Sequence, residues 1–121
     1  MPIKNILVVD DSPTDRQYLL DLLARSGYQP TGAQSAEEAL EKVRLQRPDL
    51  VLMDVVMPGQ NGFQATRTLS RDDATKDIPV IICTTKGQAT DRIWGMRQGA
   101  RDYVVKPVVP EDLLAKIAAL G

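Results

Sequence analysis

Polar and charged side chains end four apolar runs of this chain. Asp10 and Asp11 follow the first run, Asp54 follows the second, Thr84 closes the third, and Lys106 follows the fourth. If these runs are parallel strands of one sheet, their carboxyl ends meet at one edge and the side chains converge there. Carboxylates are the ligands of a hard cation such as Mg²⁺, and an ammonium group pairs with phosphate oxygens. The pattern therefore predicts a site for a divalent metal and a phosphoryl group.

Asp54 is the residue whose carboxylate we expect to react. It could attack a phosphorus atom and form an acyl phosphate, as carboxylates do in aspartyl-phosphate ATPases. Phosphoryl transfer otherwise requires mainly positioning and neutralisation of charge. A metal held by Asp11 and Asp54 would neutralise most of that charge, and Lys106 would add a second cation. The Thr84 hydroxyl would donate a hydrogen bond to a phosphoryl oxygen.

Each of these residues also has an ordinary structural interpretation. The two acids after the first run could cap a helix, but Ser12 already offers a cap ahead of Pro13. Asp54 could start the turn that follows it, since aspartate is common in turns. Lys106 could be solvated, and Thr84 could be a strand former with a locally satisfied hydroxyl. The coincidence of polar residues at four strand ends favours the functional interpretation.

The elements that must position these side chains are predicted from hydrophobic periodicity. Apolar runs of strand length cover residues 5–9, 50–54, 79–84 and 102–106, with a weaker candidate at 28–33. A stretch with helical spacing follows each run. Five strands alternating with five helices predict an α/β fold, a doubly wound parallel sheet of order 2-1-3-4-5 with flavodoxin-like topology. Its switch point lies beside the first and third strands, where the acids are expected.

Helix boundaries are marked by capping residues. Ser12 precedes a proline, Ser35 is followed three residues later by Glu38 as in a capping box, and Pro110 opens the last helix. The fourth helix is predicted to have an apolar face marked by Ile93 and Met96. The charged segment 70–78 is predicted to be a solvent-exposed loop.

Composition limits the classes of function. The chain has 121 residues, 43% of them hydrophobic, 26% charged and 4% aromatic, with a net charge of −1. We expect one domain over residues 1–121 without an output domain, no DNA binding and no membrane insertion. The N-terminus lacks a secretory signal, which predicts a cytoplasmic protein. The single cysteine, Cys83, lies in an apolar run and is interpreted as a buried structural thiol.

The positions of Asp10, Asp11, Asp54, Thr84 and the Lys106–Pro107 pair resemble the receiver domain of two-component response regulators, over essentially the whole chain. The resemblance implies that Asp54 is phosphorylated by a histidine kinase. It implies that Asp11, Asp54 and the Val56 carbonyl bind Mg²⁺ directly, and that Asp10 binds it largely through water. Thr84 and Lys106 would bind the phosphoryl group, and the Lys106–Pro107 peptide bond would be cis.

The resemblance also implies a conformational switch. Thr84 would move toward the phosphoryl oxygens, and Tyr103 would rotate inward into the space behind it. The output face would then include Ile93, Trp94, Met96 and Tyr103. Two ordinary interpretations stay open, because Tyr103 could be a fixed half-buried tyrosine and Trp94 could be packed in the core. For Trp94 core or partially covered packing is favoured, since tryptophan is largely buried on average.

The tracts 62–67 and 94–103 more narrowly resemble single-domain receivers of twitching motility and chemotaxis. Such a protein is a signalling phosphoacceptor and not an enzyme, apart from self-phosphorylation and self-dephosphorylation. Its partners would be the kinase and a downstream protein target or phosphatase, and it could instead drain phosphoryl groups from the kinase. Val56 and Lys86 replace a polar amide and an acid that assist the attacking water in well-studied chemotaxis receivers, which predicts slow dephosphorylation.

Two other classes of protein fit the sequence less well. A flavin or nucleotide carrier of this topology would need a glycine-rich or hydroxyl-rich phosphate loop after the first strand, where this chain has two acids. A metal-dependent phosphohydrolase with an aspartyl nucleophile would need an acid at position 56, which is Val56. A receiver that binds partners without being phosphorylated is disfavoured, because every functional position is filled.

Overall fold

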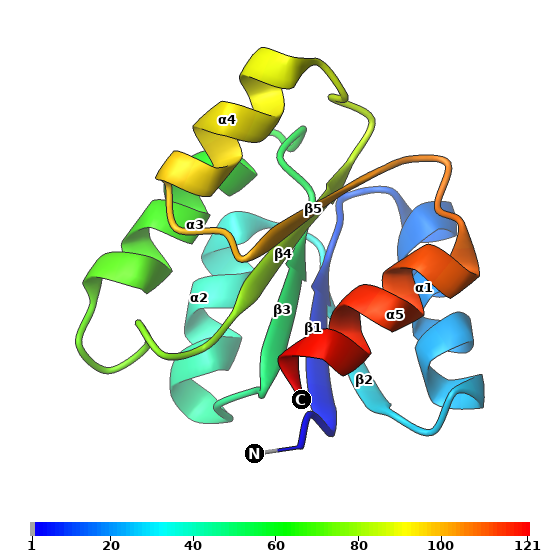
Figure 1. The fold of residues 1–121 in the computed structure, drawn as a ribbon. Helices are drawn as coiled ribbons and strands as arrows, with labels where there is room; N and C mark the ends of the chain where they lie inside the picture. Colours follow the sequence, from blue (N-terminus) through cyan, green and yellow to red (C-terminus); the bar gives the residue numbers. More distant parts are fainter. Residues whose placement is uncertain (1) are drawn as a thin grey trace.

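The computed structural model describes residues 2–121. Five strands alternate with five helices along the chain (Figure 1). The strands are β1 (Asn5–Val9), β2 (Gln29–Ala33), β3 (Leu50–Met53), β4 (Val80–Thr84) and β5 (Asp102–Val105). The helices are α1 (Pro13–Arg25), α2 (Ala36–Leu45), α3 (Gly62–Arg71), α4 (Ala89–Arg97) and α5 (Pro110–Leu120). All strand pairs are parallel in the order β2-β1-β3-β4-β5, which confirms the predicted doubly wound sheet.

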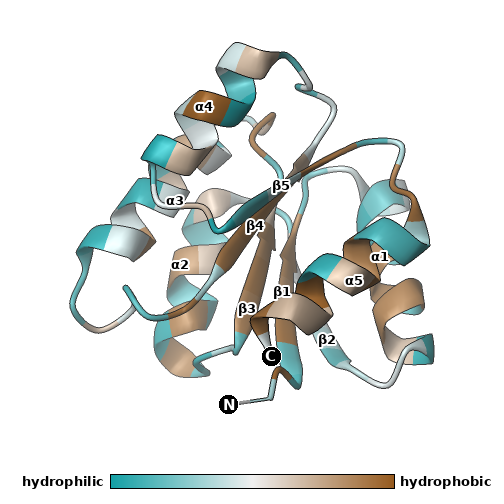
Figure 2. Ribbon diagram, in the orientation of Figure 1, coloured by the Kyte–Doolittle hydropathy of each residue, from teal (hydrophilic) through white to brown (hydrophobic). Residues whose placement is uncertain are grey.

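Helices cover both faces of the sheet, with α1 and α5 on one face and α2, α3 and α4 on the other (Figure 1). Successive side chains of a strand point to opposite faces. Leu7 and Val9 of β1 therefore join the cluster under α2 and α3, whereas Ile6 and Val8 join the cluster under α1 and α5. Figure 2 shows the central strands as hydrophobic ribbons. A continuous apolar run is what a strand buried on both faces requires.

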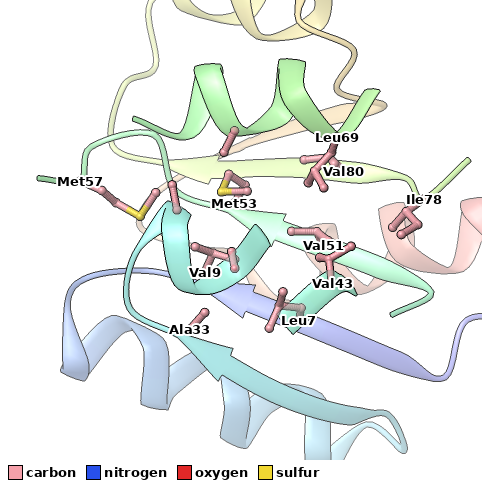
Figure 3. Packing of buried hydrophobic residues seen from close by; sticks show 13 residues of the cluster. Leu7, Val9, Ala33, Val43, Val51, Met53, Met57, Leu69, Ile78 and Val80 are labelled. Atoms are coloured by element: carbon pink, nitrogen blue, oxygen red, sulfur yellow. The ribbon is translucent and has the colours of Figure 1, made fainter. Parts of the chain in front are cut away.

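The core under α2 and α3 is built from side chains of four strands and two helices (Figure 3). Its labelled members include Val51 and Met53 of β3, Val43 of α2 and Leu69 of α3. On the opposite face, Leu113 and Ile117 of α5 are fully buried against the sheet together with α1 side chains. Both faces of the central strands are thus packed, which fixes the positions of their carboxyl ends.

Strand register brings the site residues to one edge. Val9 of β1 is paired with Met53 of β3, so the residues that follow these two strands are neighbours. The Asp54 N–H donates to the Val9 carbonyl at 3.0 Å, and the Lys106 N–H donates to the Thr84 carbonyl at 2.8 Å. These backbone hydrogen bonds extend the ladders by one residue. The backbones of Asp54 and Lys106 are therefore positioned by the sheet.

The predicted helix starts are confirmed, with one correction. Pro13 and Pro110 open α1 and α5, and the Ser12 side chain accepts from the Asp15 N–H at 3.3 Å. Ser35 caps α2 by accepting from the Glu38 N–H at 3.1 Å. The Glu38 carboxylate, however, accepts from the Gln34 N–H at 3.4 Å, one residue before the position that a capping box requires. A capping box requires the Ser35 N–H to donate to Glu38, so this part of the prediction is wrong.

Segment 70–78 is not wholly exposed, because Ile78 and Thr75 are buried and the Thr75 hydroxyl donates to the Leu69 carbonyl at 2.6 Å. Cys83 is buried and unpaired, as predicted, and burial raises the pKa of its thiol to about 12. Among residues 2–121, no helix is long and apolar enough to cross a bilayer.

Candidate functional site

The carboxyl edge of the sheet gathers the residues that the sequence singled out. Asp10 follows β1, Asp54 follows β3, Thr84 ends β4 and Lys106 follows β5. Asp10, Asp54 and Thr84 are buried, and the exposed Asp11 follows Asp10 directly. The predicted convergence of these side chains is confirmed, although residues 10 and 106 are 96 positions apart in the chain.

Lys106 is the centre of the hydrogen-bond network at this edge. Its Nζ donates to Asp10 Oδ2 at 2.6 Å, to Asp15 Oδ2 at 3.0 Å and to Asp54 Oδ2 at 3.1 Å. A lysine ammonium has three N–H donors. Three carboxylates therefore occupy all three donors, and one positive charge is shared among three negative ones.

Burial and hydrogen bonding have opposite effects on the pKa values of Asp10 and Lys106. Burial raises the pKa of the Asp10 carboxyl above its ordinary value of 3.8, although the hydrogen bond from Lys106 opposes this effect. Burial by itself would lower the pKa of the Lys106 ammonium. Hydrogen bonds to Asp10 and Asp15, with the charge of Asp54, outweigh burial and raise that pKa above its ordinary value of 10.5. Lys106 therefore remains a cation throughout the physiological pH range.

Asp54 is held at both carboxylate oxygens. Oδ1 accepts from the Val56 N–H at 3.0 Å, and Oδ2 accepts from Lys106. Two donors at fixed positions restrict the rotation of the carboxylate, and little of the side chain is exposed. Asp54 is thus a preorganised carboxylate beside two further acids, Asp10 and Asp11.

Asp10, Asp11 and Asp54 form a set that fits a hard cation. Each offers a carboxylate oxygen, and these oxygens lie within 4.8 Å of one another. Carboxylate oxygen is the donor type that Mg²⁺ prefers, and Mg²⁺ usually takes one or two carboxylates and keeps several waters. The exposed position of Asp11 leaves room for those waters. The chemistry of the donor set therefore agrees with the predicted magnesium site.

The Tyr103 side chain lies inward, packed between the sheet and α4. Its hydroxyl donates to the Lys86 carbonyl at 2.6 Å, and the Arg92 guanidinium lies 5.5 Å from the ring centroid. Burial raises the pKa of the Tyr103 phenol to about 12. The Thr84 hydroxyl is buried nearby and accepts weakly from the Lys86 N–H at 3.5 Å. The two predicted switch residues thus contact the same loop residue.

Gly95 is the position on α4 that makes room for this ring. A Cβ atom there would lie 2.8 Å from Ile82 Cδ1 and 3.0 Å from Tyr103 Cε2. Alanine normally stabilises an exposed helix by about 1 kcal/mol relative to glycine. Overpacking costs about 1–3 kcal/mol. We therefore expect Gly95→Ala to lower the free energy of unfolding by about 1 kcal/mol in urea titrations.

A double-mutant cycle tests whether contact with the Tyr103 ring causes that loss of stability. In a Tyr103→Ala background the ring is absent, so Gly95→Ala should cost less or become neutral. An equal loss in both backgrounds would show that the ring is not what Gly95 accommodates.

Helix α4 exposes three large apolar side chains. Ile93, Trp94 and Met96 are 53%, 50% and 45% exposed, while Gly95 is the buried residue of the helix. Trp94 is therefore not a core residue, and its half-exposed side chain agrees with the partially covered packing that was the other part of the favoured interpretation. The expected apolar face marked by Ile93 and Met96 points to solvent, because the helix packs on the sheet through Gly95. Tyr103 is buried, so in this structure it supports the predicted output face from below and contributes little surface to it.

Asp15 is the site residue that sequence reasoning missed. In the sequence, Asp15 is an acid in the first turn of a helix. A favourable interaction with the helix dipole is sufficient to explain such a residue. The available signal was its place just after the first strand, because that turn of α1 borders the carboxyl edge of the sheet. A hollow of about 550 Å³ opens beside it, with Tyr18, Lys106 and Pro107 in its lining. The Lys106–Pro107 peptide bond is cis, as the resemblance implied.

The strand order defines a flavodoxin-like α/β domain, and its acidic candidate site lies at the switch point of the sheet. The chain belongs to the response regulator receiver domain family, whose sequence model matches residues 6–118. This confirms the family to which its motifs pointed.

Relatives and solved structures agree with that assignment. The chain is similar to protein PilH of Pseudomonas aeruginosa, with 54% identity over 115 residues, covering 95% of each chain. It is 38% identical over 117 residues to the phosphate regulon transcriptional regulatory protein PhoB of Escherichia coli, and the match covers 97% of this chain but only 51% of PhoB. The structure of chemotaxis protein CheY4 of Vibrio cholerae is similar at a TM-score of 0.91 and 31% identity, covering 98% of this chain and 99% of CheY4.

Proposed function

We propose that this receiver domain is a phosphorylation-controlled switch that accepts a phosphoryl group from a histidine kinase on Asp54. The observation that carries the proposal is the fixed Asp54 carboxylate, bound by the Lys106 ammonium and the Val56 N–H beside two further acids. Membership of the receiver family supports it, because receivers act in two-component signalling. Asp54 has the reactive carboxylate and the neighbouring cation that the reaction needs.

The transfer forms one bond and breaks another. An Asp54 carboxylate oxygen attacks the phosphorus of a phosphohistidine, and the phosphorus–nitrogen bond breaks. The electron pair of that bond leaves with the imidazole, which takes a proton from water. Lys106 stays protonated and stabilises the charge on the phosphoryl oxygens. The product is an acyl phosphate on Asp54.

Asp11, Asp54 and the Val56 carbonyl would hold Mg²⁺ directly, with Asp10 acting largely through water. When bound, the ion would neutralise charge on the phosphoryl oxygens and relieve repulsion among the carboxylates. The support for this assignment is the carboxylate set, whose oxygens lie within 4.8 Å of one another.

The signal would be read on the surface of α4. In this proposal the Thr84 hydroxyl donates to a phosphoryl oxygen, and Tyr103 is held inward against the Lys86 carbonyl. The output face would consist of Ile93, Trp94 and Met96, with Tyr103 beneath it. Support comes from the contact of both switch residues with the loop that precedes α4.

We further propose that the phosphoryl group is lost slowly. The Val56 side chain is about half exposed at the rim of the site, and an apolar side chain cannot orient an attacking water. Val56→Asn should shorten the half-life of the acyl phosphate, measured by loss of label after the donor is removed. An unchanged half-life, or one of only seconds in the wild type, would contradict this proposal.

The wider role is proposed from the same comparisons. We propose a cytoplasmic regulator in a motility pathway, with a kinase as donor and a downstream protein or phosphatase as partner. PilH matches over 95% of both lengths, and CheY4 is described as a chemotaxis protein. No catalytic activity beyond self-phosphorylation and self-dephosphorylation belongs to the proposal, nor does DNA binding.

The test is metal-dependent labelling with mapping of the site. The domain is incubated with a small phosphodonor such as acetyl phosphate, in Mg²⁺ or in chelator, and intact protein is weighed. We expect a mass gain of one phosphoryl group in Mg²⁺ only. Borohydride reduction should then convert the labelled aspartate to homoserine at position 54. Labelling in chelator, or homoserine at another position, would overturn the proposal.

A further inference from the structure

Lys106 has no free N–H donor in the unphosphorylated domain. Asp10, Asp15 and Asp54 each accept one hydrogen bond from its Nζ, at 2.6, 3.0 and 3.1 Å. A phosphoryl group brings three acceptor oxygens and about −1.5 to −2 of charge to this ammonium. It must therefore compete with carboxylates that already hold Lys106.

The three carboxylates differ in how easily they can release the lysine. The side chains of Asp10 and Asp54 are 1% and 8% exposed, whereas that of Asp15 is 48% exposed. A buried carboxylate that loses its cation keeps the full cost of desolvation. Water can solvate Asp15 instead, and the side chain borders the hollow of about 550 Å³ beside Lys106. Asp15 is thus the partner with the smallest cost of release.

We propose that Asp15 is a positioning residue that competes with the phosphoryl group for Lys106. In the unphosphorylated domain it holds one Lys106 donor, and it gives up that donor when Asp54 is phosphorylated. Its negative charge also opposes the incoming anion. Asp15 therefore lowers the affinity of the site for a phosphoryl group. This inference rests on the proposed function, because it assumes that Lys106 contacts the phosphoryl group on Asp54.

The experiment measures binding of beryllofluoride, a tetrahedral phosphoryl analogue, to the whole chain in saturating Mg²⁺ by ¹⁹F NMR. Asp15→Asn removes the charge with little change of shape, and Asp15→Ser is a second variant without a carboxylate. Asp15→Glu keeps the negative charge, so this variant should bind beryllofluoride with the affinity of the wild type. Asp21→Asn is the matched control, because Asp21 lies on the same helix and its carboxylate accepts from Gln17 instead of Lys106.

We expect Asp15→Asn and Asp15→Ser to bind beryllofluoride about fivefold more tightly, as suits a partly exposed ion pair. Mg²⁺ affinity without beryllofluoride should not increase in these variants, and Asp21→Asn should behave like the wild type. A merely structural role for Asp15 would weaken both affinities together. Urea midpoints verify that each variant is folded.

Three outcomes would overturn the inference: unchanged or weaker binding in both Asp15 variants, equal tightening in Asp21→Asn, or no restoration by Asp15→Glu. If the wild type binds beryllofluoride but the Asp15 variants bind it equally well, only the inference about Asp15 fails. If the wild type does not bind it in Mg²⁺, the proposed function fails as well.

Discussion

Replacing Asp54 by asparagine is expected to abolish phosphorylation of the domain. The amide has nearly the shape of the carboxylate, and its oxygen can still accept the hydrogen bond that the Val56 N–H donates to Asp54 Oδ1 at 3.0 Å. An amide oxygen is a far weaker nucleophile than a carboxylate, so the rate of acyl phosphate formation should fall by at least about 10³-fold. The measurement is the mass of intact protein after incubation with acetyl phosphate and Mg²⁺.

A matched control distinguishes loss of the nucleophile from loss of negative charge. Asp73→Asn makes the same chemical change on an exposed residue that pairs with Lys76. This variant should be labelled at the wild-type rate. Labelling of Asp54→Asn at the same rate would remove Asp54 from its assigned role. Label on another residue of the variant would show that the acidic edge can be phosphorylated without it.

Lys106→Met should destabilise the metal-free domain strongly. The substitution removes the ammonium that contacts Asp10, Asp15 and Asp54. Asp10 and Asp54 are buried, and removal of one partner from a buried ion pair typically costs about 3–5 kcal/mol. Asp10 can relieve part of this cost by taking up a proton, because burial already raises its pKa. We expect a loss of about 3 kcal/mol in the free energy of unfolding at neutral pH in chelator.

Mg²⁺ should reduce the difference between this variant and the wild type. A divalent cation among the carboxylates replaces the missing positive charge, and binding to the folded state alone adds stability. Lys116→Met is the control, because Lys116 pairs with Asp112 at 2.8 Å on the surface and should cost less than about 1 kcal/mol. Urea titrations of both variants with Mg²⁺ and with chelator make the comparison. A Lys106→Met domain as stable as the wild type in chelator would contradict our account of the network.

The sequence predicted the sheet and the position of its functional edge. Parallel strands buried on both faces must be continuous apolar runs, and β1, β3 and β4 have that composition. The residue after each run then lies at the carboxyl edge whatever the detailed packing. Asp10, Asp54 and Lys106 were therefore predictable neighbours. Their chemistry predicted the kind of ligand, because it depends on residue type.

Helix orientation was less predictable. Periodicity marked Ile93 and Met96 as the apolar face of α4, yet both are about half exposed. The helix instead packs through Gly95, because only a residue without a Cβ atom lets it approach Ile82 and the Tyr103 ring. A glycine contributes nothing to a hydrophobic pattern. The local sequence therefore concealed which side of α4 faces the sheet.

The sequence by itself determined the order of the elements, the strand ends and the residue types gathered there, because these follow from composition and from the geometry of parallel strands. Only the tertiary structure decided that Asp15 contacts Lys106, from which it is 91 positions distant in the chain. That contact depends on the rotation of α1 over the sheet and on the rotamers of the Asp15 and Lys106 side chains. Packing of the whole core fixes both, and no local pattern encodes them.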